Sequence, residues 1–116
     1  MPNPIVHFEI LGKDKAKLQQ FYADAFDWKI DASNPMGYGM VDNAGEGING
    51  GIDGDAPGVL VYIAVDDPAA YLKKVEGMGG KIVQDVTVIP GMVTLAKFSD
   101  PEGNIVGLVA NEMPSA

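Results

Sequence analysis

The sequence predicts an α+β fold in which two βαβββ modules form a curved mixed sheet around a cupped pocket. Three observations predict it. The chain has 116 residues, which suits one domain. The order strand, helix and three strands occurs twice, and the 15 glycines cluster where tight turns between short strands are expected. We therefore expect a single domain over residues 1–116, with modules at 1–55 and 56–116.

The first module opens with an alternating strand and an amphipathic helix. Ile5 to Leu11 alternates in polarity, which puts His7 and Glu9 on the same face of a strand. From Asp14 to Phe26 apolar residues recur at helical spacing, and Asp14 is well placed to cap the first turn. Three short strands are then expected at 28–30, 37–41 and 48–52.

The second module repeats this order. Val59 to Val65 predicts an apolar strand, Asp66 and Asp67 before Pro68 predict a helix start, and Ala69 to Met78 has helical spacing. Three strands are expected at 81–88, 92–98 and 104–109, followed by a tail at 111–116. A shift of 52 residues overlays Asp14 on Asp66 and the first helix on the second, which indicates an internal repeat.

Composition excludes several classes of function. The formal net charge is −8 and the isoelectric point is about 4.3, so nucleic acid and anionic membrane would be repelled. All eight basic residues are lysine, which leaves no arginine fork to bind phosphate or carboxylate in bidentate fashion. With no cysteine and no long apolar run, we expect a cytoplasmic protein without a membrane span or a signal peptide.

Five segments in these elements resemble one known superfamily. The segments are HFEI, FYADAFDWKI, VYIAVDDP, GMGGKIV and FSDPEGNIVGL. Together they resemble the vicinal oxygen chelate superfamily, which includes glyoxalases, bleomycin resistance proteins and extradiol dioxygenases. The resemblance covers nearly the whole chain and implies a glyoxalase-like domain of paired βαβββ modules, in a homodimer that shares its pockets.

The resemblance also implies where a divalent metal would bind, because family enzymes hold it through the first and last strands of each module. Carried over, these positions fall on His7, on Leu60, on Gly107 and within Asn49 to Gly51. Only His7 is a good ligand, and one imidazole does not fix a catalytic metal. We therefore predict no metal and no other cofactor. A replacement ligand set would have to come from Glu9, Glu46 or Tyr62.

Two groups of residues are candidates for a functional site. His7 could accept a proton, since an ordinary imidazole titrates near pH 6.5, and Glu9 could orient it. The predicted ligand contacts are Tyr38, Met40, Tyr62, Met92 and Thr94, which would line an apolar and aromatic pocket. Tyr22 and Trp28 are expected to pack the helix against the sheet rather than to line the pocket.

Two functions remain open at this stage. The first is a glyoxalase-like or bleomycin-resistance-like protein that binds a small organic ligand, cationic or neutral, without a catalytic metal. The alternative is an enzyme, either a lyase or isomerase acting beside a carbonyl with His7 as general base or metal ligand, or a dioxygenase-like protein. In both cases the expected partners are a small molecule and a second copy of the chain.

Overall fold

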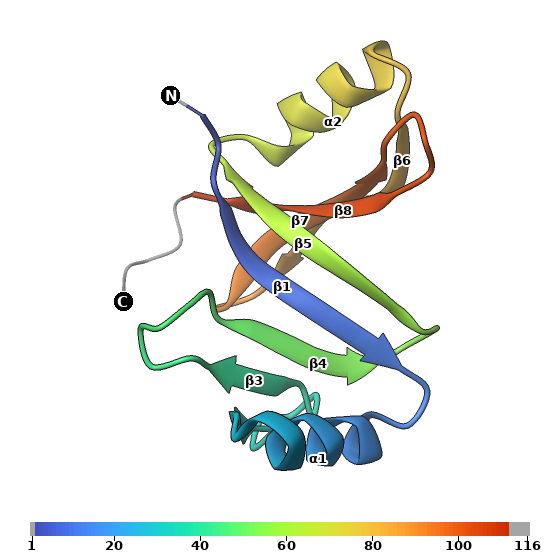
Figure 1. Cartoon of the computed structure of the whole chain (residues 1–116). Coiled ribbons are helices and arrows are strands. Elements are labelled where there is room, and N and C mark those ends of the chain that lie inside the picture. Colours follow the sequence, from blue (N-terminus) through green and yellow to red (C-terminus); the bar gives the residue numbers. More distant parts are fainter. Residues whose placement is uncertain (1, 112–116) are drawn as a thin grey trace. The chain divides into compact units, whose positions relative to one another are not determined.

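Both modules fold in the predicted order, and the fold class is α+β. The computed structural model describes residues 2–111, so the predicted tail lies outside the described residues apart from Asn111. The elements are drawn in Figure 1. In chain order they are β1 (Ile5–Gly12), α1 (Lys15–Phe26), β2 (Lys29–Asp31), β3 (Gly39–Asp42), β4 (Gly50–Gly54), β5 (Gly58–Val65), α2 (Pro68–Gly77), β6 (Lys81–Ile89), β7 (Val93–Ser99) and β8 (Ile105–Ala110).

The chain divides into two compact units. The first unit is Val6–Leu60, and the second unit joins the residues up to Ile5 with the chain from Val61 onward. The division falls at Leu60, within the strand β5. The N-terminal residues join the second unit because the backbone N–H of Ala64 donates to the carbonyl of Pro4 at 2.9 Å.

The first unit has a mixed sheet in the order β2-β3-β4-β1. β1 runs parallel to β4, while β3 is antiparallel to β2 and to β4. Helix α1 begins where the Asp14 carboxylate accepts a hydrogen bond from the backbone N–H of Lys17 at 3.1 Å. The Gln19 amide donates to the carbonyl of Ile52, which is fully buried, and so ties the helix to the sheet.

Aromatic rings fill the space between α1 and its sheet. Trp28 stacks on Tyr22 with ring centroids 5.3 Å apart and contacts Phe8 at 5.5 Å. This confirms the expected packing role of Trp28 and Tyr22. Phe21 is different, because its side chain is 59% exposed although it touches the edge of Tyr22.

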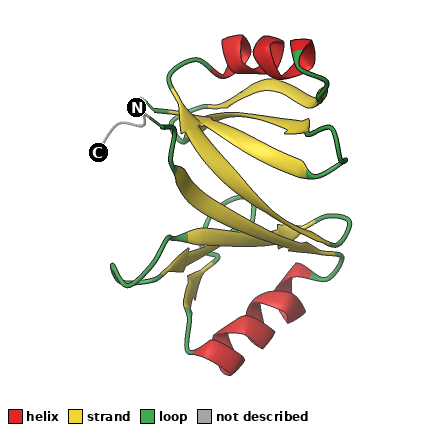
Figure 2. Ribbon diagram, turned by 45° about the horizontal axis from the view of Figure 1, so that its top comes forward, coloured by secondary structure: helices red, strands yellow, loops and turns green. Residues whose placement is uncertain are grey.

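The second unit repeats the topology with the order β5-β8-β7-β6, in which β5 and β8 are parallel. Its core lies between α2 and one sheet face and is formed by Val65, Leu72, Ala96 and Leu108. Figure 2 shows that, within each unit, the helix covers one face of the strands. No helix within residues 2–111 is long and apolar enough to cross a membrane.

The helix caps correct the register of the internal repeat. Asp14 caps α1 and Asp67, not Asp66, caps α2, because the Asp67 carboxylate accepts from the backbone N–H of Ala70. The two caps are therefore 53 residues apart, while the predicted offset of 52 holds only for Lys29 and Lys81, the first residues of β2 and β6. Asp66 is the residue before the cap.

Candidate functional site

Strand β1 separates two kinds of side chain. Phe8 points toward α1, where it contacts Trp28, so His7 and Glu9 lie on the opposite face of the sheet. The register pairs Phe8 with Gly50 and Glu9 with Gly51 on β4. Both glycines make room for a ring: a Cβ on Gly50 would lie 2.4 Å from Phe8, and one on Gly51 would lie 1.7 Å from the Tyr38 hydroxyl.

Tyr38 joins His7 and Glu9 into one hydrogen-bonded group, the polar cluster. The Tyr38 hydroxyl donates to Oε2 of Glu9 at 3.0 Å and lies 2.9 Å from Nε2 of His7. A hydroxyl has a single proton, so when that proton is on the bond to Glu9, Nε2 of His7 is the donor to Tyr38. In that arrangement the imidazole has its proton on Nε2 and its lone pair on Nδ1. The sequence analysis expected Glu9 to orient His7, and these hydrogen bonds run through Tyr38.

A turn before β3 holds Tyr38 in place. The side-chain amide of Asn34 makes two hydrogen bonds to the backbone of Tyr38, donating to its carbonyl at 2.7 Å and accepting from its N–H at 3.0 Å. Gly37 adopts φ +65°, a left-handed conformation that glycine tolerates best. The sequence analysis missed Asn34, although the Asn-Pro-x-Gly pattern at 34–37 is typical of such a turn.

The electrostatics of the polar cluster favour a neutral imidazole. Burial lowers the pKa of His7 below its usual value of 6.5, and the Glu9 carboxylate only partly opposes this effect. Glu9 itself is buried, with 8% of its surface exposed. At neutral pH the cluster therefore combines an unprotonated imidazole, a phenol and a carboxyl group, a set able to bind a polar group of a ligand or to move a proton.

The residues present do not fit the divalent metal that the fold family implies. The phenol oxygen of Tyr38 is within hydrogen-bond distance of both His7 and Glu9, so these two side chains already bond to a hydroxyl. The β4 and β8 positions that pair with Glu9 and Tyr62 are Gly51 and Gly107, which have no donor side chain. No group of three or more His, Cys, Asp or Glu side chains suited to a metal occurs in the described part of the chain.

The second unit has a related arrangement on the face away from α2. Tyr62 on β5 pairs with Gly107 on β8, which in turn pairs with Lys97 on β7. The Tyr62 ring covers Gly107, since a Cβ there would lie 2.2 Å from it. The equivalent positions on β1, β4 and β3 of the first unit are Glu9, Gly51 and Met40. The ring over Gly51 there is that of Tyr38, so each unit has a tyrosine ring over its central glycine.

The other predicted ligand contacts are dispersed. Met40 pairs with Gly51, which puts it on the face of the polar cluster, and it is 51% exposed. Met92 lies in the turn between β6 and β7, where its N–H donates to the carbonyl of Ile89. Thr94 shares its face of β7 with Ala96, a core residue beneath α2, and thus lies on the opposite face from Tyr62.

Comparisons with known proteins agree on the family. The sequence model of the Glyoxalase/Bleomycin resistance protein/Dioxygenase superfamily matches residues 4–108. A curated relative is the protein CFP32 of Mycobacterium bovis and Mycobacterium tuberculosis, whose name places it with the glyoxylases. It is 30% identical over 106 residues, which cover 82% of this chain and 41% of the relative. The chain therefore spans less than half of that protein.

Solved structures share the fold at low identity. A superfamily member from Vibrio splendidus has a TM-score of 0.66 at 16% identity, covering 95% of this chain and 100% of its own. A hypothetical protein from Bacillus halodurans has a TM-score of 0.69 at 15% identity, covering 100% and 99%. Methylmalonyl-CoA epimerase from Mycobacterium tuberculosis has a TM-score of 0.64 at 14% identity, covering 91% and 86%. At these identities the likeness establishes the fold.

Proposed function

The chain belongs to the Glyoxalase/Bleomycin resistance protein/Dioxygenase superfamily, and from this membership we propose that it binds a small organic ligand without a catalytic metal. The observation that supports the proposal is the Tyr38 hydroxyl, hydrogen-bonded to both His7 and Glu9. In metal-dependent relatives, as the family resemblance implies, a cation would contact the ligand's oxygens. Here the polar cluster would serve as the anchor instead.

Charge narrows the class of ligand. The net charge of −8 and the absence of arginine make phosphate-rich or carboxylate-rich ligands unfavourable. Met40 adds an exposed, polarisable surface beside the cluster, which suits an apolar ring or chain. The proposed ligand is therefore neutral or cationic, with an apolar body and one hydrogen-bonding group. A cytoplasmic site of action, expected from the lack of cysteine, is part of the same proposal.

The first experiment measures metal content and ligand binding on the same samples. Untagged, dialysed protein is analysed for metals, and its thermal unfolding is followed with added zinc, nickel or manganese and then with a library of neutral and cationic aromatic compounds. We expect no stoichiometric metal, and a thermal shift with some organic compounds that Tyr38→Phe weakens. The matched control is Tyr71→Phe, which removes a hydroxyl that accepts from Asn3 in the second unit.

Either of two results would contradict this function. One is about one metal ion per chain, bound in the wild type and lost in His7→Ala, because that requires a ligand set the proposal excludes. The other is compound binding that Tyr38→Phe and Tyr71→Phe leave equally unchanged, because the polar cluster would then take no part in it.

A second candidate function is proton transfer beside a carbonyl, and the lowered pKa of His7 is the specific observation that favours it. An imidazole that stays unprotonated at neutral pH is available as a general base. Such an enzyme would exchange the proton next to the substrate's carbonyl with solvent. The exchange can be followed directly by proton NMR in D2O with small neutral carbonyl compounds, the ligand class that the charge of the chain favours. Exchange that His7→Ala abolishes while binding persists would favour the enzyme over the binding protein.

A further inference from the structure

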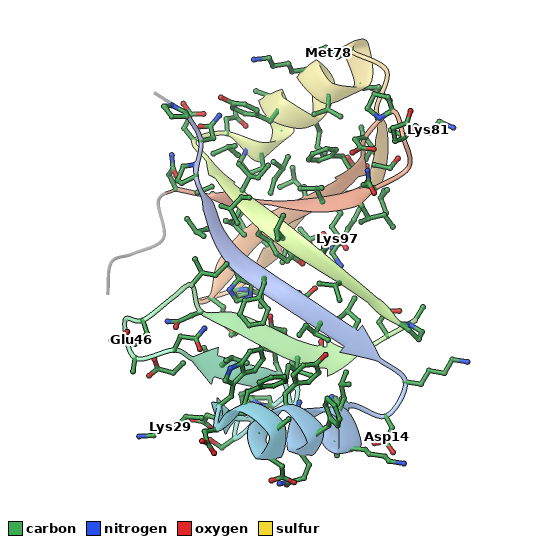
Figure 3. The ribbon with its side chains drawn as sticks, in the orientation of Figure 1. Asp14, Lys29, Glu46, Met78, Lys81 and Lys97 are labelled. Atoms are coloured by element: carbon green, nitrogen blue, oxygen red, sulfur yellow. The ribbon has the colours of Figure 1, made fainter. Side chains whose placement is uncertain are left out.

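Two side chains of α1 bind the turn that precedes β3. The Lys15 ammonium donates to the carbonyl of Met36 at 2.6 Å, and the Gln19 amide donates to the carbonyl of Gly37 at 3.2 Å. Figure 3 labels Asp14 at the start of α1 and shows side chains between this helix and the strands of its unit. Lys15 and Gln19 are four residues apart, so they lie on the same face of the helix.

Each of these two side chains also binds β4. Nε2 of Gln19 donates to the carbonyl of Ile52 at 2.9 Å as well, so both N–H groups of this amide have an acceptor. The Lys15 ammonium lies 3.7 Å from Oδ1 of Asp53 and forms an ion pair with it. Lys15 and Gln19 therefore each join the turn to the strand, and we call this pair the α1 clamp.

The α1 clamp holds the chain neighbours of Tyr38 and of the glycine that its ring covers. Gly37 immediately precedes Tyr38, and Ile52 immediately follows Gly51. The Tyr38 ring lies against Gly51, where a Cβ would meet its hydroxyl at 1.7 Å. Because the Gln19 amide ties Gly37 to Ile52, it fixes how far this ring extends over the strand.

We propose that the α1 clamp positions the Tyr38 hydroxyl in the polar cluster, which makes Lys15 and Gln19 positioning residues of the candidate site. They act from the face of the sheet that α1 covers, whereas the cluster lies on the opposite face. Their effect on ligand binding rests on the proposed function, whereas the position of the hydroxyl can be measured with no ligand present.

The single histidine of the chain reports the position of the hydroxyl. Nε2 of His7 lies 2.9 Å from the Tyr38 oxygen, so the ring-nitrogen shifts of His7 in 15N-labelled protein at neutral pH depend on that contact. Tyr38→Phe gives the shifts without the hydroxyl. Gln19→Glu keeps the length of the side chain but loses both donors when ionised. It should move the His7 signals roughly half of the way or more toward those of Tyr38→Phe, since a hydrogen bond weakens steeply with displacement.

Gln20→Glu is the matched control, because it makes the same change of charge one residue further along α1. The Gln20 amide is exposed and donates to Asp24 at 2.8 Å. The His7 signals of this variant should match those of the wild type. Lys15→Met and Lys17→Met form a second pair, in which only the first removes a contact of the clamp and only the first should shift His7.

Gly39→Ala displaces the Gln19 amide from the strand side. Gly39 pairs with Ile52 in the sheet, and its new Cβ would lie 2.7 Å from Nε2 of Gln19. Because this nitrogen is at the flexible end of a side chain, it can move aside without disrupting the core. Gly39→Ala should therefore stay folded and shift His7 in the same direction as Gln19→Glu. In the Tyr38→Phe background neither variant should shift His7 further, because the hydroxyl on which they act is gone.

Three results would overturn the proposal when circular dichroism shows that the variants are folded. One is wild-type His7 signals in both Gln19→Glu and Gly39→Ala. Another is an equal shift in Gln19→Glu and Gln20→Glu, which would make the added charge the cause. The third is a shift that persists in full in the Tyr38→Phe background, which would bypass the hydroxyl. Failure of all compounds to bind would contradict the proposed function alone and would leave these outcomes unchanged.

Discussion

Gly51→Ala should break the polar cluster without substituting any of its three residues. The new Cβ would lie 1.7 Å from the Tyr38 hydroxyl oxygen and 1.9 Å from its Cζ. Carbon atoms pack at about 3.5–4.0 Å, so the ring has to move by roughly 2 Å. A hydrogen bond fails beyond about 3.5 Å, and the bonds from Tyr38 to His7 and Glu9 start at 2.9 and 3.0 Å.

The magnitude follows from the two lost hydrogen bonds. A neutral hydrogen bond contributes about 1 kcal/mol and one to a charged group about 1.5–3 kcal/mol, so Gly51→Ala should lower the free energy of unfolding by about 3 kcal/mol. For a chain of this size that is a fall of about 10 °C in Tm. The control is Gly54→Ala on the same strand, whose Cβ would meet Lys15 at an ordinary 3.6 Å and should change stability by less than about 0.5 kcal/mol.

Urea unfolding followed by circular dichroism measures these free energies, and a double-mutant cycle with Tyr38→Ala locates their cause. Once the ring is gone, Gly51→Ala should cost almost nothing more, which gives a coupling energy of about 3 kcal/mol between the two positions. The reasoning is refuted if Gly51→Ala is as stable as Gly54→Ala, or if its cost persists in full in the Tyr38→Ala background.

Three further predictions concern other parts of the molecule. Burial lowers the pKa of His7 in the folded state, so the unfolded chain binds the proton more readily, and the stability present above the ordinary pKa of 6.5 is lost as the pH falls below it. His7→Gln, which removes the only histidine, should flatten the change in unfolding free energy between pH 7.5 and 5.5. Parallel curves for the variant and the wild type would contradict this. Gly107→Ala should lower the free energy of unfolding in urea by about 3 kcal/mol, because the new Cβ would lie 2.2 Å from a buried tyrosine ring. Gly58→Ala, with open space around it, should lower it by less than about 0.5 kcal/mol. Equal losses in the two variants would contradict the packing. Leu72→Ala should destabilise the second unit by about 3 kcal/mol in the same assay. Val88→Ala, at a side chain that is 64% exposed, is the near-neutral comparison. A Leu72 variant as stable as the Val88 variant would be inconsistent with a core at Leu72.

The sequence predicted the fold wherever local chemistry decides the structure. Asp14 before an amphipathic stretch and the alternation around His7 each specify one element, and both are found. β4 was expected at 48–52 but begins at Gly50. Glycines have no side-chain polarity to alternate, so the start of that strand is set by pairing with β1, which no local pattern contains.

The candidate site was predicted only in part, because its key contacts are not local. Period-two spacing puts Tyr38 and Met40 on one face, and the structure agrees. The same rule could have separated Thr94 from Tyr62, but only if β8 were known to pair with β7 on one side and with β5 on the other. That the Tyr38 ring lies over Gly51 depends on two segments 13 residues apart meeting across the sheet, which spacing alone does not specify.

The irregular pairing of β6 affects how well the last strand of its unit could serve as a template for another strand. β6 ends the strand order of its unit, and its exposed side chains include Val83, Val86 and Val88. A flat apolar edge of nine residues would be a template for other extended chains. The register shifts between Ile82 and Thr87 interrupt the regular ladder, and Asp85 adds a charge within them. The register shifts and the charge of Asp85 are thus features of the kind that disfavour the addition of another strand along an exposed edge.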